Sequence, residues 1–263
     1  MKKTLLMVSI VCGMVGLYAG EGITSPKQNF TVDGSVGFKS EHFSRGRNEL
    51  HKVIASRIKM GYQAFDEITP YIGVSSTFGT KSPTLLNHIS PCVGVLCNVA
   101  DKVTLDAGCE YHFYTAIPSK KDNGQPSRIK RHSREVHLGI TFDTFMKLSL
   151  TGFYDFDRKE ALFEGVGEYN LDLSFLFSGL GIDAWAKVGY DCVSNPMGIE
   201  NSGLPKTRYC YYGAGTDLAY RFNGVRVKVG VGYEKNLAKE EWVNRDVIDG
   251  KNMVLSASVD CSF

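Results

Sequence analysis

The segment NMVLSASVDCSF, residues 252–263, decides the fold. Apolar or small side chains occupy every second position from Met253 to Phe263, while serines and Asp260 occupy positions between them. This alternation is typical of a β-strand with one apolar and one polar face. A terminal segment is usually the frayed part of a domain. The pattern here instead predicts a strand that is held in a sheet by a partner elsewhere in the chain.

Alternation of the same kind recurs along the whole chain and predicts an antiparallel all-β protein. We expect about twelve strands, most of them ten residues or longer, whereas strands of soluble proteins average about five or six residues. Segments of this length, with alternate residues apolar, are typical of a transmembrane β-barrel. The predicted strands are 30–43, 50–63, 68–78, 88–99, 103–114, 134–143, 147–156, 163–175, 182–192, 207–222, 225–234 and 252–263.

The connections between these strands alternate in length. Long loops are expected at 44–50, 79–87, 116–131, 157–161, 194–206 and 235–251. Tight turns are expected between the other strand pairs, including the hairpin dipeptide Asn223-Gly224. Long loops at one end and short turns at the other, with an even number of strands, are typical of bacterial outer-membrane barrels. We therefore predict an up-and-down barrel with extracellular loops and periplasmic turns.

A barrel in a bilayer must close, because lipid offers no hydrogen-bond partners to an unpaired strand edge. The first strand carries the required alternation at Val32, Val36 and Phe38. We therefore expect the backbone of 252–263 to pair with residues near 30–40. Phe263 is then expected at the periplasmic interface.

The first nineteen residues are interpreted as a secretory signal peptide, so the barrel domain is expected over residues 20–263. Lys2 and Lys3 precede an apolar stretch, and Leu17-Tyr18-Ala19 supplies a small-residue cleavage site. A lipoprotein signal that uses Cys12 is disfavoured, because Val11 stands where a small residue is expected. The predicted location is the bacterial outer membrane, with outer-membrane lipid as the surroundings.

The polar face of the predicted strands should line the barrel interior. Twelve strands enclose a lumen wider than a side-chain-filled barrel of eight and narrower than a sixteen-stranded porin. Opposed charges in such a lumen would select solutes, although an ion-paired plug would use the same residues. The pore-lining candidates are Lys39, Arg57, Lys59, Asp106, Glu110, Glu135, His137, Lys147, Asp172, Asp183, Lys187, Arg226 and Lys228.

Aromatic residues lie mostly toward strand ends, which favours interfacial girdles at the two membrane surfaces. Phe30, Tyr62, Tyr71, Tyr154 and Phe156 are among them. The alternative is the core of a β-sandwich, where aromatic residues would concentrate in mid-strand. The formal net charge of +2, with both signs interspersed, indicates no nucleic-acid partner.

Several stretches together resemble the TorF-type porin family of conserved hypothetical proteins. They are GSVGFKSEHFSRGRNEL, ITPYIGVSSTFG, LDAGCEYHFYTAIP and REVHLGITFDTFMKLSLTGFYDF, followed by the terminal Ser262-Phe263. The resemblance implies an outer-membrane barrel with a channel role and brings no catalytic residues. It also implies that Phe263 is the signal read by the barrel-assembly machinery. The sequence departs from the family where Ser44 stands before Arg45 and in its larger number of cysteines.

The remaining polar residues and the cysteines offer further candidates for chemistry. His132, Ser133 and Glu135 loosely resemble the site of an outer-membrane phospholipase, but adjacent residues of a strand point to opposite faces. Cys192 and Cys210 flank a long loop and form a candidate disulfide. Cys97, Cys109 and Cys261 are interpreted as small lipid-facing residues. No cysteine or histidine spacing indicates a metal site, and no cofactor is expected.

The sequence favours a passive, porin-like channel for small polar solutes that is not an enzyme. One alternative is a structural or surface-contact barrel that acts through loops 115–133, 193–206 and 235–251, with lipopolysaccharide as a neighbouring partner. A weaker alternative is an outer-membrane hydrolase.

Overall fold

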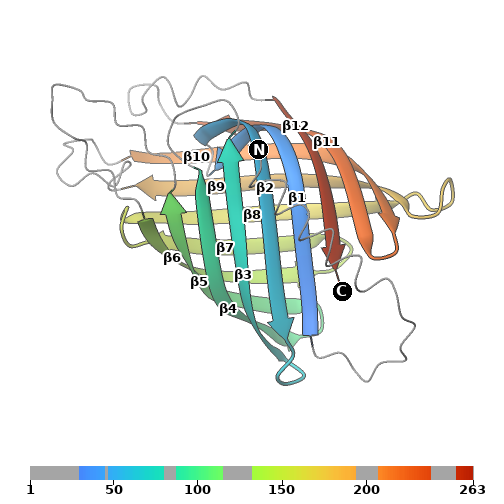
Figure 1. Ribbon diagram of the computed structural model, residues 1–263, viewed down its shortest axis with the longest axis horizontal. Helices are drawn as coiled ribbons and strands as arrows, with labels where there is room; N and C mark the ends of the chain where they lie inside the picture. Colours follow the sequence, from blue (N-terminus) through green and yellow to red (C-terminus); the bar gives the residue numbers. More distant parts are fainter. Residues whose placement is uncertain are drawn as a thin grey trace, which may run out of the picture.

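The computed structural model describes residues 30–44, 47–79, 87–114, 132–193, 207–237 and 253–262, which form a closed ring of antiparallel strands (Figure 1). Each strand pairs with its neighbours in sequence. The strands are β1 (Phe30–Ser44), β2 (Arg47–Tyr62), β3 (Ile68–Gly79), β4 (His88–Ala100), β5 (Val103–Tyr114), β6 (His132–Asp143), β7 (Lys147–Asp155), β8 (Glu160–Asp172), β9 (Leu180–Val193), β10 (Thr207–Phe222), β11 (Val225–Asn236) and β12 (Met253–Ser262).

The pairing of β12 with β1 closes the ring, and the two strands lie side by side in Figure 1. The register runs from Asp33 opposite Ser262 to Lys39 opposite Ser256. The predicted pairing of the C-terminal strand with residues near 30–40 is therefore confirmed. No described strand edge is left open to the bilayer, as a membrane barrel requires.

The outer surface of the barrel is apolar, as the alternation predicted. On β12 the side chains of Met253 and Leu255 are 58% and 61% exposed, and on β11 Val229 is 62% exposed. Exposed apolar residues of this size occur on the described part of every strand. A continuous apolar surface of this extent is unfavourable in water and is typical of the lipid-facing belt of a membrane barrel.

Among the described residues, no helix is long and apolar enough to cross a bilayer.

Most predicted strand limits agree with the structure, and three details were wrong. Strand β1 continues to Ser44 and strand β2 begins at Arg47, so residues 44–50 do not form a long loop. Strand β8 begins at Glu160, within the loop expected at 157–161. It ends at Asp172 rather than at 175, because the Asp172 carboxylate accepts hydrogen bonds from the Ser174 N–H and hydroxyl and starts a turn.

The expected hairpin turn between β10 and β11 is confirmed. Asn223 and Gly224 both have positive φ, 44° and 77°, as a two-residue type I′ turn requires. The predicted signal peptide, 1–19, and Phe263 lie outside the described residues. The same holds for most of the three loops proposed as contact surfaces, since 115–131, 194–206 and 238–252 are not described.

Candidate functional site

The inner wall of the barrel carries the candidate site. Inward positions alternate with the exposed apolar residues, so Arg226 and Lys228 point inward on either side of the outward-facing Val227. The same parity places all thirteen pore-lining candidates on the inner wall, from Lys39 on β1 to Lys228 on β11. Their role in passing a solute stays a prediction.

One side of the inner wall is acidic. It is formed by β5–β8, where Lys147 is the single inward lysine or arginine of the strand residues, and its Nζ lies 3.5 Å from Glu168 Oε2. The inward acids of these four strands are Asp106, Glu110, Glu135, Asp143, Asp155, Glu160, Glu164, Glu168 and Asp172. We call this surface the acidic wall.

The opposite side carries more bases. In the ring order, β11, β12, β1 and β2 lie across the barrel from β5–β8. Their described inward bases are Lys39, Arg57, Lys59, Arg226 and Lys228, and their described inward acids are Asp33, Glu234 and Asp260. We call this surface the mixed wall. The two walls together create a transverse electric field across the interior.

Ion pairs run around the wall and not across the lumen. The pairs join Lys187 Nζ to Glu234 Oε2 at 2.7 Å, Lys228 Nζ to Asp260 Oδ2 at 2.7 Å, and Arg226 to Asp183. Each links adjacent strands or strands one apart. Lys39 and Arg57 form no ion pair with any described residue. Of the mixed-wall bases, Arg226 and Lys228 are therefore paired, while carboxylates remain in excess on the acidic wall.

A belt of polar contacts links β2, β3, β5 and β6. Lys59 Nζ lies 3.5 Å from the centre of the Tyr71 ring. The Tyr71 hydroxyl donates a hydrogen bond of 2.8 Å to Asp106 Oδ1 and lies 3.1 Å from His137 Nε2. Tyr71 is therefore an inward residue, and grouping it with the interfacial girdle was wrong. Parity alone could have shown this, because Tyr71 lies one position from the outward-facing Ile72.

Two tyrosines lie flat along the inner wall because glycines leave room for them. A Cβ atom on Gly189 would be 2.1 Å from Tyr211 Cζ, and one on Gly94 would be 2.4 Å from the Tyr71 hydroxyl. The Tyr211 hydroxyl donates a hydrogen bond of 2.6 Å to Glu164 Oε2. The rings thereby cover the wall without extending into the lumen.

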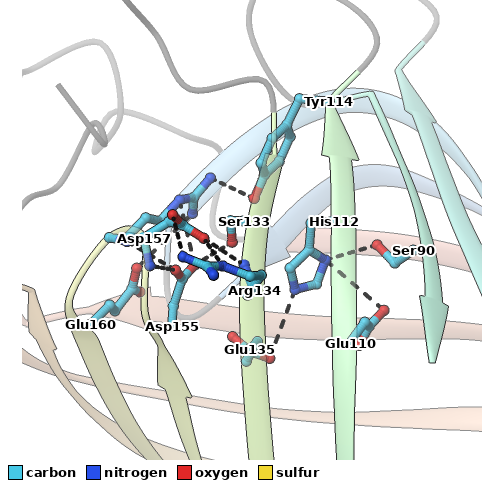
Figure 2. A network of polar contacts seen from close by, with 11 residues as sticks. Ser90, Glu110, His112, Tyr114, Ser133, Arg134, Glu135, Asp155, Asp157 and Glu160 are labelled. Atoms are coloured by element: carbon cyan, nitrogen blue, oxygen red, sulfur yellow. Dashed lines mark hydrogen bonds and ion pairs between the residues drawn. The ribbon is translucent and has the colours of Figure 1, made fainter. Parts of the chain in front are cut away.

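A polar network occupies the inner wall at the end of the barrel where β5 and β7 end and β6 and β8 begin, which we call the outer mouth (Figure 2). Ser90 Oγ is 2.8 Å from His112 Nδ1. Glu110 Oε1 lies 4.0 Å from the same nitrogen, and Glu135 Oε1 lies 3.9 Å from His112 Nε2. Ser90 is fully buried and Glu135 is 4% exposed. Three neighbouring strands, β4, β5 and β6, thus place these groups in contact.

The short turn between β7 and β8 is tied to the same network. Asp155 Oδ1 accepts hydrogen bonds from the N–H groups of Asp157 and Arg158, and its Oδ2 accepts one of 2.5 Å from Ser133 Oγ. The Arg158 guanidinium donates a hydrogen bond of 2.7 Å to the Tyr114 hydroxyl. The turn is therefore anchored to the start of β6 through Ser133 and to the end of β5 through Tyr114.

Ser133 and His132 do not form a catalytic pair of a nucleophile and a general base. Ser133 is 1% exposed on the inner face and bonds to Asp155. His132 lies on the opposite face, where its ring stacks on Tyr111 with 5.7 Å between centres. A hydrolase would need the histidine within hydrogen-bond reach of the serine, so this candidate site is not assembled.

The candidate disulfide between Cys192 and Cys210 is absent, and both cysteines are free. Register explains why, because Cys192 lies opposite Arg208 while Cys210 lies opposite Tyr190. The two cysteines are diagonal neighbours, and diagonal positions are about 7–8 Å apart, too far for a disulfide. Cys97 lies opposite Leu105, not opposite Cys109.

Sequence reasoning missed several members of this inner wall. Trp185 and Tyr211 alternate with outward residues and could have been assigned by parity. The contacts of Ser90 and His112 could not, because they depend on which residues of separate strands lie opposite each other. The one local signal was Glu110-x-His112, in which a carboxylate and an imidazole two residues apart share a strand face.

No family model and no curated protein sequence matches the chain. The TorF-type assignment therefore stays a prediction. Among solved structures, the chain is similar to a NanC porin with a TM-score of 0.50 and 9% identity, covering 88% of this chain and 98% of that chain. It is also similar to the COG4313 outer membrane channel from Pseudomonas putida F1, with a TM-score of 0.50 and 11% identity over 93% and 98%.

A third similar structure is LpxR from Salmonella typhimurium, an outer-membrane enzyme. Its TM-score is 0.51 at 8% identity, and the match covers 87% of this chain and 99% of that chain. Identities this low show a shared fold and carry no activity from one protein to another. Channels and an enzyme both share the fold, so the chain is a porin-like β-barrel of the outer-membrane type and this fold alone does not determine its function.

Proposed function

We propose that this barrel is a passive outer-membrane channel for small polar solutes, with a preference for cations. The observation that carries the proposal is the composition of the interior. Charged and polar side chains line it, and the one buried apolar cluster among the described residues contains only Leu162 and Tyr211, with Phe153 packed against them. An interior of this kind is filled by water and not by a packed core.

The charge distribution supports the preference for cations. The nine inward acids of the acidic wall outnumber its one lysine by more than the five inward bases of the mixed wall outnumber its three acids, so the two walls together carry a net negative charge. A net negative lumen attracts cations and repels anions.

Current recording in planar bilayers tests this proposal. The refolded full-length protein should produce discrete current steps at both polarities, and boiled protein should produce none. An absence of steps in preparations that show the heat-modifiable gel shift of a folded barrel would remove the channel function. The surface-contact barrel would then be the remaining reading, with lipopolysaccharide and the barrel-assembly machinery still predicted partners.

We also infer that the chain is not a phospholipase acting through His132 and Ser133, because these residues lie on opposite faces and Ser133 is buried. Phospholipid incubated with the refolded protein should remain intact by mass spectrometry. Release of fatty acid that depends on Ser133 would contradict this inference.

A further inference from the structure

We propose that Glu110, His112 and Glu135 form a binding site for a divalent transition-metal ion, with Zn²⁺ as the matching common ion. The site lies on the inner wall near the outer mouth (Figure 2). It goes beyond the channel function, because metal binding here does not depend on whether the lumen conducts.

The geometry of the three side chains is close to that of a metal site. One donor atom from each residue can be chosen so that all three lie within 4.8 Å of one another. Zinc bonds of about 2 Å at tetrahedral angles place donor atoms about 3.3 Å apart. The glutamates would therefore move inward by roughly 1 Å, which rotation of their flexible side chains can supply.

Hydrogen-bond contacts with neighbouring serines hold two of the three donor residues, His112 and Glu110, in place. The buried Ser90 hydroxyl lies 2.8 Å from His112 Nδ1, and Ser75 Oγ donates a hydrogen bond of 3.1 Å to Glu110 Oε1. When Nδ1–H donates to Ser90, the lone pair is carried by Nε2, which lies 3.9 Å from Glu135 Oε1. Metal-binding histidines are commonly fixed in this way, by a hydrogen bond from the second ring nitrogen.

The electrostatics of the site also favour a divalent ion. Glu110 and Glu135 lie directly opposite each other on β5 and β6. Like charges in this relation repel, and the repulsion is stronger because Glu135 is buried. A protonated His112 would neutralise one carboxylate, whereas a divalent cation between the three groups would neutralise both.

The donor set indicates the class of metal. One imidazole and two carboxylates suit Zn²⁺ and neighbouring transition metals. Metals that prefer thiolate ligands, and metals that prefer oxygen ligands alone, match this donor set less well. Three protein donors leave a coordination position for water. The Glu110 side chain is 26% exposed, so an ion in the lumen can reach the site.

Calorimetric titration of the metal-free, refolded full chain with Zn²⁺ tests the proposal. We expect one tight site per chain, weakened at least tenfold in Glu110→Gln, His112→Gln and Glu135→Gln. Glu168→Gln removes an inward carboxylate on β8, and His132→Gln removes a histidine of the outer face. Both controls should bind Zn²⁺ as the unchanged protein does.

Cobalt absorption identifies the ligands. Co²⁺ bound at this site should give visible d–d bands without thiolate charge-transfer bands, and Zn²⁺ should displace it. All variants are compared only as folded barrels with a heat-modifiable gel shift. If buried Glu135→Gln fails to fold, the more exposed Glu110→Gln decides the outcome.

Unchanged Zn²⁺ affinity in the folded Glu110→Gln and His112→Gln variants would overturn the proposal, as would the absence of a stoichiometric site. Thiolate bands with Co²⁺ would overturn it as well, by assigning the metal to cysteines. Each of these outcomes leaves the bilayer currents unaffected, so failure of the metal site is distinguishable from failure of the channel function.

Discussion

Gly189 and Tyr211 show how single residues shape the lumen. The Tyr211 ring occupies the space that a side chain at position 189 would need, and its hydroxyl bonds to Glu164 across β9. The ring is 1% exposed although it belongs to the inner wall. The width of the lumen beside Tyr211 therefore depends on the absence of a Cβ atom at Gly189 as well as on the number of strands.

We predict that Gly189→Ala narrows the channel. The new methyl group would displace the Tyr211 ring into the lumen and break its bond to Glu164, at a cost of about 1–3 kcal/mol in stability. Single-channel conductance should fall, and the urea midpoint of unfolding should decrease. Gly152→Ala is the control, because its Cβ would meet Phe163 at an ordinary 3.4 Å on the outer face. Equal conductance in both variants and the unchanged protein would contradict this account.

At the residue scale the sequence predicted which face each side chain occupies but not its partners. Parity placed Lys187 and Glu110 inward correctly, since their strands keep a period of two around these residues. It could not pair Lys187 with Glu234, because these residues come from strands one apart in the ring. Such contacts follow from the stagger of the strands, which local sequence does not determine.

The strands β1 and β12 are the elements on which closure depends. Each is predictable from its own alternation, and their mutual register places Gly34 opposite Cys261. A Cβ atom built on Gly34 would lie 2.9 Å from Cys261 Sγ. This close approach makes the seam of the barrel accessible to a direct chemical test.

We predict that Gly34→Cys forms a disulfide with the natural Cys261 on mild oxidation. The bond would join the two ends of the barrel, so the boiled protein should migrate differently on gels with and without reductant. Val36→Cys is the control, because it lies opposite Val259 and only diagonally from Cys261, beyond disulfide reach. Identical mobility of oxidised and reduced Gly34→Cys would argue against this register, as would an equal shift in Val36→Cys.

The late end that the sequence predicted for β8 has a local origin. The sequence placed the end of β8 too late, because Leu173 and Phe175 continue the apolar alternation beyond Asp172. Side-chain hydrogen bonds to Ser174 end the strand earlier. Local turn chemistry thus outweighs the apolar pattern at a strand end, where lost ladder bonds can be replaced by bonds to water.

For the whole molecule, fold and interior chemistry were predictable to different degrees. Long alternating strands, short turns and an even strand count are each visible in the sequence, and together they define a closed barrel. The opposition of the acidic and mixed walls became visible only with the ring order, which sets β5–β8 across from β11–β2. The polar network around His112 at the outer mouth could be identified only when the strand register and the side-chain positions were also known.

The reversal potential in a KCl gradient across a planar bilayer tests the central claim most directly. The excess of carboxylates on the acidic wall predicts a reversal potential of the sign set by K⁺, and its magnitude should fall in a folded Glu164→Gln/Asp172→Asn variant. A reversal potential near zero, or of the sign set by Cl⁻, would contradict a cation-preferring channel whose selectivity comes from this wall.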